Sequence, residues 1–201
     1  MQIHVIGKGS FGKKRIEAIK QVGKSTDYKT AEAVIVCVPT KFHKELTIKA
    51  LKDGKHVLCE KPFAMNVKEA EEMVKVANET GKFLKIGSNH RFFKNILEAH
   101  KKNIGNMLSF DGFIGHNGKR IKNTWYWDKS LSGGGTLIDT GWHMIDLARW
   151  FMGDLNFLCK TLLKQDEANI SLVAKSGRIA RVRSSWKHNG EYIKIKILGN
   201  Q

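Results

Sequence analysis

The chain has 201 residues, of which 41% are hydrophobic, and carries a formal net charge of +16 at pH 7. This length supports a real core, in one large domain or two small ones, and the absence of any run of about 18 apolar residues excludes a membrane-spanning helix. The basic residues are spread from Lys8 to Lys196 without a long block, so we interpret the charge as solvated surface and do not expect nucleic acid as a partner. A phosphorylated or nucleotide-linked substrate is compatible with this charge.

The first 90 residues alternate between strand and helix patterns. The predicted strands cover residues 3–6, 33–38, 56–59 and 83–87, and the predicted helices cover residues 12–22, 41–51 and 67–80. The second strand is continuously apolar and mostly β-branched, which is typical of a strand covered on both faces. Strand–helix alternation with short links predicts right-handed crossovers and a parallel sheet. The sequence therefore predicts an α/β, Rossmann-like domain over residues 1–91.

A glycine pattern follows the first predicted strand and opens the first predicted helix. Gly7, Gly9 and Gly12 have the spacing of the dinucleotide fingerprint. In that motif the backbone turns tightly and approaches a pyrophosphate, whose charge is favoured by the helix N-terminus. We therefore predict that NAD or NADP binds at this turn. The alternative is a glycine-rich turn without a ligand.

One strand–helix unit is missing from this alternation. Only residues 23–32 separate the first helix from the second strand, which is too short for a strand, a helix and two turns. The acidic residue that should hold the adenosine ribose, about 20 positions after the glycines, has no clear equivalent, because Asp27 lies in a loop-like segment. The sequence therefore does not distinguish NAD from NADP.

Two further segments follow predicted parallel strands at their carboxyl ends, where open α/β sheets place their ligands. They are residues 59–62 (Cys-Glu-Lys-Pro) and residues 39–43 (Pro-Thr-Lys-Phe-His). A lysine at such a point can donate to a substrate hydroxyl and stabilise an alkoxide as it forms. An isolated lysine is more often a solvated surface charge, but the place of Lys61 between a buried strand and a proline favours a function.

After residue 91 the pattern changes. A helix is predicted over residues 92–104, and strands over residues 107–115, 157–163, 169–174, 179–186 and 192–198. Consecutive strands with little helix between them predict a mainly antiparallel sheet. The sequence thus predicts a second, α+β domain over residues 92–201.

Residues 136–152 predict one helix with an unusual distribution of polar side chains. Asp139, His143 and Asp146 share one stripe at about 100° per residue, while almost every other direction is apolar. A narrow polar stripe on an otherwise apolar helix indicates a cleft or a buried network, because surface helices are polar over about half of their circumference. A carboxylate one turn before an imidazole is suited to acid–base chemistry.

Together these segments resemble the Gfo/Idh/MocA oxidoreductases, the family of glucose–fructose oxidoreductase and inositol dehydrogenase. The resemblance covers nearly the whole chain. The segments that carry it are residues 7–12, 36–43, 54–62 and 87–92, and residues 133–146 with their Asp-x-Gly-x-His block.

The resemblance implies a hydride transfer between NAD(P) and a secondary alcohol, usually of a sugar or cyclitol. It implies that Lys61 hydrogen-bonds the nicotinamide ribose and the reacting hydroxyl, that His143 is the general acid/base at that hydroxyl, and that Asp139 orients the substrate. It implies cofactor contacts along the glycine turn and the strand ends, and no metal site. The implied cofactor-binding residues are Gly7, Gly9, Ser10, Phe11, Gly12, Pro39, Thr40, His43, Glu60 and Lys61.

Three further residues are candidate substrate contacts. Arg91 suits a carboxylate or phosphate, and the aromatic faces of Trp125 and Trp127 suit the C–H surface of a sugar. Packing in a core or at a domain interface is an equal alternative for the two tryptophans. We expect a small, sugar-like molecule as the partner.

The end of the sequence departs from the resemblance. Relatives continue with further sheet strands, so the chain is interpreted as a compact or shortened member, with a homo-oligomer through the C-terminal sheet as an open alternative. The cysteines at 37, 59 and 159 lie in apolar runs and predict buried thiols in a reducing compartment. The N-terminal strand leaves no room for a signal peptide, which predicts a cytoplasmic protein.

Two functions are consistent with these patterns. The first is an active NAD(P)-dependent oxidoreductase acting on a sugar, cyclitol or nucleotide sugar. The alternative is a cofactor-poor, catalytically weak descendant that serves as a sugar-binding or assembly protein, because the adenosine side of the cofactor site is cut short.

Overall fold

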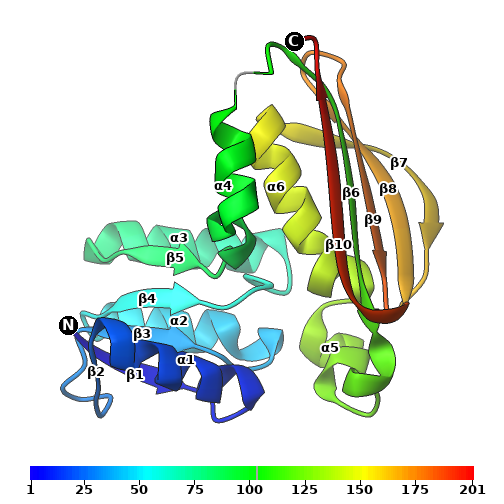
Figure 1. The fold of residues 1–201 in the computed structure, drawn as a ribbon. Helices are drawn as coiled ribbons and strands as arrows, with labels where there is room; N and C mark the ends of the chain where they lie inside the picture. The colour runs from blue at the N-terminus through cyan, green and yellow to red at the C-terminus, as the bar shows by residue number, and fades with distance from the viewer. Residues whose placement is uncertain (103) are drawn as a thin grey trace. The chain divides into compact units, whose positions relative to one another are not determined.

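The computed structural model describes residues 1–102 and 104–201, and its chain divides into two units (Figure 1). Unit 1 contains Met1–Gly87 and Ser130–Gly133, and unit 2 contains Ser88–Lys129 and Gly134–Gln201. Among the helices of the described residues, none combines the length and apolar character needed to cross a bilayer.

Unit 1 is built on a parallel sheet in the order β2-β1-β3-β4-β5 (Figure 1). Its strands are β1 (Gln2–Ile6), β2 (Lys24–Ser25), β3 (Ala33–Val36), β4 (His56–Cys59) and β5 (Leu84–Ile86). Its helices are α1 (Ser10–Val22), α2 (His43–Lys52, preceded by the 3₁₀ turn Thr40–Phe42) and α3 (Val67–Thr80). The predicted Rossmann-like parallel sheet is confirmed.

The central strand β3 is buried on both faces because its side chains alternate between two clusters. Val34 and Val36 are fully buried against α2 and α3, whose contribution includes Met73. Ile35 points to the opposite face, where it packs against Ile19 of α1. Burial of one such side chain stabilises the fold by about 1.5–3 kcal/mol, which explains the unbroken apolar run in the sequence.

The predicted absence of a full strand–helix unit after α1 is confirmed, although a short strand remains there. No helix lies between β2 and β3 in the described residues, but a strand of two residues, β2, remains. Ser25 at its end is level with Ile3, so β2 stops three residues before the carboxyl end of β1. The chain then turns, with the Ala31 amide donating to the Asp27 carbonyl at 3.1 Å. Asp27 therefore begins a turn and does not end a full-length strand.

Unit 2 contains a five-stranded sheet in the order β10-β6-β9-β8-β7. Its strands are β6 (Met107–Asn117), β7 (Leu155–Leu163), β8 (Glu167–Ala174), β9 (Ile179–Ser185) and β10 (Lys187–Gly199). Its helices are α4 (Lys94–Lys101) and α6 (Trp142–Met152), and the short α5 spans Lys129–Ser132. The neighbouring strands pair antiparallel except β6 and β9, which run parallel, so the predicted mainly antiparallel sheet is confirmed.

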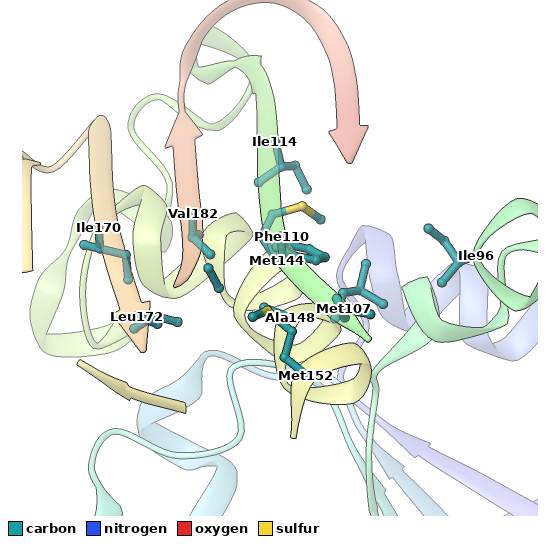
Figure 2. Packing of buried hydrophobic residues seen from close by; sticks show 12 residues of the cluster. Ile96, Met107, Phe110, Ile114, Met144, Ala148, Met152, Ile170, Leu172 and Val182 are labelled. Atoms are coloured by element: carbon teal, nitrogen blue, oxygen red, sulfur yellow. The ribbon is translucent and has the colours of Figure 1, made fainter. Parts of the chain in front are cut away.

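Helix α6 covers one face of this sheet and supplies much of the core (Figure 2). Met144, which is fully buried, lies beside Phe110 of β6, and Val182 of β9 points into the same cluster. Gly112 leaves room for this contact, because a Cβ atom there would lie 3.1 Å from the Met144 sulfur. The apolar directions of the predicted helix are therefore its core face.

Three details differ from the sequence predictions. The helix predicted over residues 136–152 begins with a π-helical turn, Leu137–Gly141, before α6. The helix predicted over residues 92–104 is shorter, since α4 spans Lys94–Lys101; the prediction also crosses residue 103, which is outside the described residues. Cys159 is exposed rather than buried, because it lies on the edge strand β7.

Candidate functional site

The glycine turn of unit 1 has three glycines with three different surroundings. Gly7 has φ +117°, and a Cβ atom there would overlap the carbonyl oxygen of Cys37. A Cβ atom at Gly12 would overlap the carbonyl oxygen of Gly7, so the start of α1 packs directly on the turn. A Cβ atom at Gly9 would have nothing within 4 Å. The turn is thus tight where the chain packs on itself and open at the residue that caps α1.

The start of α1 is suited to an anion. Gly9 is the N-cap, and the first turn of the helix carries no acidic residue. Ser10 and Phe11 open the helix, and Phe11 is 43% exposed, with the Lys14 ammonium 5.5 Å from its ring centroid. Amide groups and a helix dipole that point to an open surface are the chemistry that binds a pyrophosphate. The residues present fit a dinucleotide cofactor.

Glu60 ties the strand-end loop to α1. Its Oε1 accepts hydrogen bonds from Arg15 Nε at 2.6 Å and Nη2 at 2.5 Å, and the Glu60 residue is 7% exposed. A Cβ atom at Gly87 would lie 2.9 Å from Glu60 Oε2, so β5 closes over the carboxylate. This ion pair fixes the backbone next to Lys61, whose peptide bond to Pro62 is cis. Arg15 was not identified from the sequence.

His43 supports the same loop from inside the unit. It is 1% exposed, and its Nδ1 and Nε2 lie 2.7 Å from the Pro62 carbonyl and 2.9 Å from the Val38 carbonyl. Burial lowers the pKa of His43, and the facing carbonyls and Glu60 oppose this effect in part. Of its neighbours, Pro39 caps the 3₁₀ turn and Thr40 is fully buried. These residues position the loop from beneath.

The cysteines beside the turn are not nucleophiles. Burial raises the pKa of the Cys37 thiol to about 12, and the Glu60 carboxylate adds to the shift. Burial also raises the pKa of Cys59 to about 12. At neutral pH both remain protonated thiols, which are unreactive.

In unit 2, Asp139 lies in a buried network. The residue is 7% exposed, accepts a hydrogen bond from the Trp186 indole at 3.3 Å, and lies 3.7 Å from His116 Nε2. Sequence reasoning missed both partners. His116 follows Gly115 and Trp186 follows Ser185. Gly115 and Ser185 are paired in the parallel β6–β9 ladder, so the fold brings both partners to the same end of the sheet.

His143 is held by a second histidine. Its ring stacks on that of His90 with a centroid distance of 3.8 Å and an angle of 18° between the planes. Both residues are buried, at 6% and 8% exposure. The His90 ring also lies 4.7 Å from Phe93, so an aromatic stack fixes the plane of the His143 imidazole. His90 lies within the segment 87–92, but no local pattern marked it as a partner of His143.

Arg91 and Asp146 form a pair across the helices of unit 2. The guanidinium donates through Nε to Oδ2 at 2.8 Å and through Nη2 to Oδ1 at 2.5 Å. The carboxylate raises the pKa of Arg91 above its usual value. Asp146 is therefore a structural partner of Arg91, and the same guanidinium stays one-third exposed.

The tryptophans of the segment after β6 separate into two positions. Trp125 stacks on Tyr126 at 4.0 Å. Trp127 lies 5.0 Å from the ring of Trp186, the indole that donates to Asp139. Unit 2 thus brings Trp127 and Asp139 to the same aromatic residue. Among the described residues, no group of three or more His, Cys, Asp or Glu could hold a metal ion.

Comparisons with known proteins agree with this geometry. Residues 13–88 match the profile of the oxidoreductase family with an NAD-binding Rossmann fold, and residues 91–201 match the GFO/IDH/MocA C-terminal domain. The first match begins just after the glycine turn, so the turn is supported by its own geometry.

Several curated relatives are sugar dehydrogenases by name. The chain is 36% identical over 126 residues to D-glucoside 3-dehydrogenase of Escherichia coli (strain K12), an alignment that covers 61% of this chain and 36% of the relative. It is 32% identical over 168 residues to glucose-6-phosphate 3-dehydrogenase of Bacillus subtilis (strain 168), covering 80% of this chain and 46% of the relative. The chain therefore spans less than half of the length of these two relatives.

Solved structures share the fold along the whole chain. Levoglucosan dehydrogenase in complex with NADH and levoglucosan matches with a TM-score of 0.86 at 22% identity, covering 100% of this chain and 71% of that one. GenD2 from gentamicin A biosynthesis, in complex with NAD, matches with a TM-score of 0.84 at 22% identity and covers 100% and 70% of the two chains. These likenesses show the fold alone.

Proposed function

Since the chain belongs to the Gfo/Idh/MocA oxidoreductase family, we propose that it transfers a hydride between NAD or NADP and a secondary alcohol of a sugar, cyclitol or nucleotide sugar. The observation that carries the proposal is the glycine turn, which is tight at Gly7 and Gly12 and open at Gly9. Such a turn at the start of a helix is the recurring binding element for the pyrophosphate of these cofactors.

Unit 1 would hold the cofactor through backbone and strand-end groups. The amides at the start of α1, around Gly9, Ser10 and Phe11, would donate to the pyrophosphate. The residues Pro39, Thr40, His43 and Glu60 shape the strand ends beside it, mostly from buried positions. When bound, the nicotinamide ring supplies the site that gives or accepts the hydride.

Three side chains would manage the substrate. Lys61 donates a hydrogen bond to the reacting hydroxyl and stabilises the negative charge that develops on its oxygen. His143 takes the hydroxyl proton during oxidation and returns it during reduction. Asp139 orients the substrate, with its own position set by Trp186. Arg91, Trp125 and Trp127 are proposed contacts to the rest of the sugar.

A cofactor titration tests the proposal. NADH and NADPH should each be assayed by quenching of tryptophan fluorescence, followed by turnover of glucosides and inositols. We expect saturable binding of one of the two cofactors and loss of turnover of at least about 100-fold in Lys61→Met and in His143→Gln, with cofactor binding retained in the latter. Absence of binding at millimolar cofactor would refute the proposal.

The short strand β2 favours a second candidate function. Because β2 ends level with Ile3, the sheet offers little support to an adenosine ribose, and each lost hydrogen bond weakens binding by about 1 kcal/mol. A cofactor-poor descendant would act as a sugar-binding or assembly protein. Sugar binding without NADH or NADPH binding in the same titration would favour this function over the first.

Further features of the whole protein are proposals of the same kind. The substrate is a small, sugar-like molecule rather than nucleic acid. The C-terminal sheet, which exposes Leu158 by 51% and Leu198 by 45%, would be the contact of a homo-oligomer. The free cysteines suit a reducing compartment, which favours the cytoplasm.

A further inference from the structure

A basic, aromatic-walled pocket of about 540 Å³ lies in unit 2, next to the network of Asp139. Its walls include the rings of Trp127 and Trp186, and its charged lining residues are Lys119, Lys122, Lys187 and Asp166. Nothing in the roles proposed above uses these four charged residues. The pocket is large enough for a monosaccharide, since ligand pockets begin at about 300 Å³.

Two backbone–backbone hydrogen bonds and one side-chain hydrogen bond fix the walls of the pocket. The Gly118 amide donates to the Trp186 carbonyl at 2.6 Å, and the Trp186 amide donates to the Asp166 carbonyl at 2.8 Å. The Gln165 side chain donates to the Trp127 carbonyl at 2.7 Å. Gly118 has no room for a side chain, because a Cβ atom would lie 2.8 Å from the Cβ of Trp186. The pocket is therefore formed by the fold before any ligand enters.

The charge of the pocket is positive and partly uncompensated. Lys187 is neutralised locally, since its ammonium lies 3.4 Å from Asp166 and 2.8 Å from Glu167. Lys119 and Lys122 have no carboxylate within salt-bridge distance among the described residues. Two unpaired ammonium groups at one pocket attract an anion, and phosphate is the anion that lysine commonly binds as a point charge.

The aromatic walls select a ring rather than a bare anion. Two indole faces suit the C–H surface of a sugar, as they do in the substrate contacts already considered. The Trp127 indole nitrogen is buried and lacks a hydrogen-bond partner among the described residues. Trp127 therefore contributes its apolar ring to the pocket rather than a hydrogen bond.

The pocket is connected to Asp139, the residue proposed to orient the substrate. Trp186 lines the pocket, and its indole N–H donates to Asp139 Oδ2 at 3.3 Å. We propose that the pocket binds the phosphate of a sugar phosphate and that this class is the substrate of the chain. The inference rests on the proposed function for Asp139, but binding of the sugar phosphate in the pocket requires no cofactor.

The test measures binding of glucose 6-phosphate, glucose and inorganic phosphate to the full chain at constant ionic strength, with tryptophan fluorescence as the signal. We expect saturable binding of glucose 6-phosphate that is at least about tenfold tighter than that of glucose or of phosphate, because only the sugar phosphate makes both the charge-assisted hydrogen bonds and the ring contacts. Equal affinity for glucose and glucose 6-phosphate would overturn the proposal. So would tighter binding of phosphate alone or of a single-stranded oligonucleotide.

Variants assign the binding to this pocket. In the double variant Lys119→Met/Lys122→Met the preference for glucose 6-phosphate over glucose should disappear, and Trp127→Phe should weaken glucose 6-phosphate binding several-fold. The control Lys101→Met/Lys175→Met removes the same charge from exposed positions of unit 2 outside the pocket and should bind as the unchanged chain does. An equal loss in the control would overturn the proposal.

A parallel NADH and NADPH titration separates the two claims. If glucose 6-phosphate binds at the lysines while neither cofactor binds, the proposed oxidoreductase fails and the phosphate pocket stands. If a cofactor binds and the lysine variants do not alter sugar selectivity, the pocket assignment fails and the oxidoreductase stands.

Discussion

Replacing two glycines of the same turn by alanine should have opposite consequences for stability and for cofactor binding. Gly12→Ala places a Cβ atom well inside 3.0 Å of the Gly7 carbonyl oxygen, a separation that real Cβ atoms essentially never show. Gly9→Ala adds the same atom where nothing lies within 4 Å. The two variants thus carry an identical chemical change in two different surroundings.

The magnitudes follow from these surroundings. Overpacking against backbone that cannot rotate away costs about 1–3 kcal/mol, and the better helix propensity of alanine at Gly12 offsets about 1 kcal/mol of this. Because the overlap is with backbone, the cost lies at the upper end of this range, and Gly12→Ala should therefore lower the free energy of unfolding of the chain by about 2 kcal/mol. Gly9→Ala should cost less than about 1 kcal/mol, which is the difference between glycine and alanine at an N-cap. At Gly9 the added methyl would instead occupy the open space that we propose for the pyrophosphate.

Two measurements on each variant check the reasoning. Urea unfolding followed by circular dichroism gives the free energy of unfolding, and fluorescence titration gives the affinity for NADH and NADPH. We expect Gly9→Ala to unfold almost as the unchanged chain does but to bind the cofactor at least about tenfold more weakly, equivalent to about 1.4 kcal/mol. Unchanged cofactor affinity in Gly9→Ala, or equal destabilisation by both substitutions, would refute the argument.

Three other perturbations test single contacts. Arg15→Met should lower the free energy of unfolding by about 2–3 kcal/mol because it strands the buried Glu60 carboxylate, and urea unfolding of a Arg15→Met/Glu60→Leu variant should recover most of the loss. His90→Leu should lower kcat about tenfold at unchanged cofactor affinity, because the ring stack on His143 is lost. His90→Phe keeps an aromatic ring and should keep most of the activity. Equal kinetics of the two variants would contradict this expectation. Burial lowers the pKa of His43 below 6.5, so the unfolded chain takes up the proton at a higher pH than the folded chain does. The contribution of His43 to the free energy of unfolding should therefore be constant above about pH 6.5 and fall below that pH. Urea midpoints measured between pH 7.5 and 5 should fall less in His43→Gln than in the unchanged chain.

The sequence was most informative where structure depends on neighbours along the chain. Helix α3 was predicted to its last residue, because a polar cap at Asn66, an amphipathic repeat and the left-handed Gly81 are all local signals. The three glycines of the turn were also recognised from the sequence, because the strand–helix junction fixes their spacing. For the same reason the parallel and antiparallel character of the two sheets followed from the order of the elements.

Prediction failed where a contact depends on pairing far along the chain. The strand β2 has two residues, too few to produce a periodic pattern, and it exists because Ser25 pairs with Ile3. The partners of Asp139 were not predicted, because no local sequence pattern near His116 or Trp186 indicates that β6 and β9 pair with each other. Cys159 was expected to be buried because its sequence neighbours are apolar. It is exposed because β7 is an edge strand, a position that the local sequence does not reveal.

The single parallel pair of the second sheet, β6 and β9, has a consequence for how specificity can change in this molecule. Both strands finish at the same end of the sheet, and residues 118–127 after β6 and the start of β10 after Trp186 also line the pocket proposed for phosphate. Insertions or exchanges in residues 118–127, which lie outside the paired strands, would alter ligand choice without disturbing the register of the ladder or the apolar face beneath α6. This end of the sheet is therefore a natural place for grafted loops, where a protein engineer could diversify the sugar that is recognised while the scaffold stays constant.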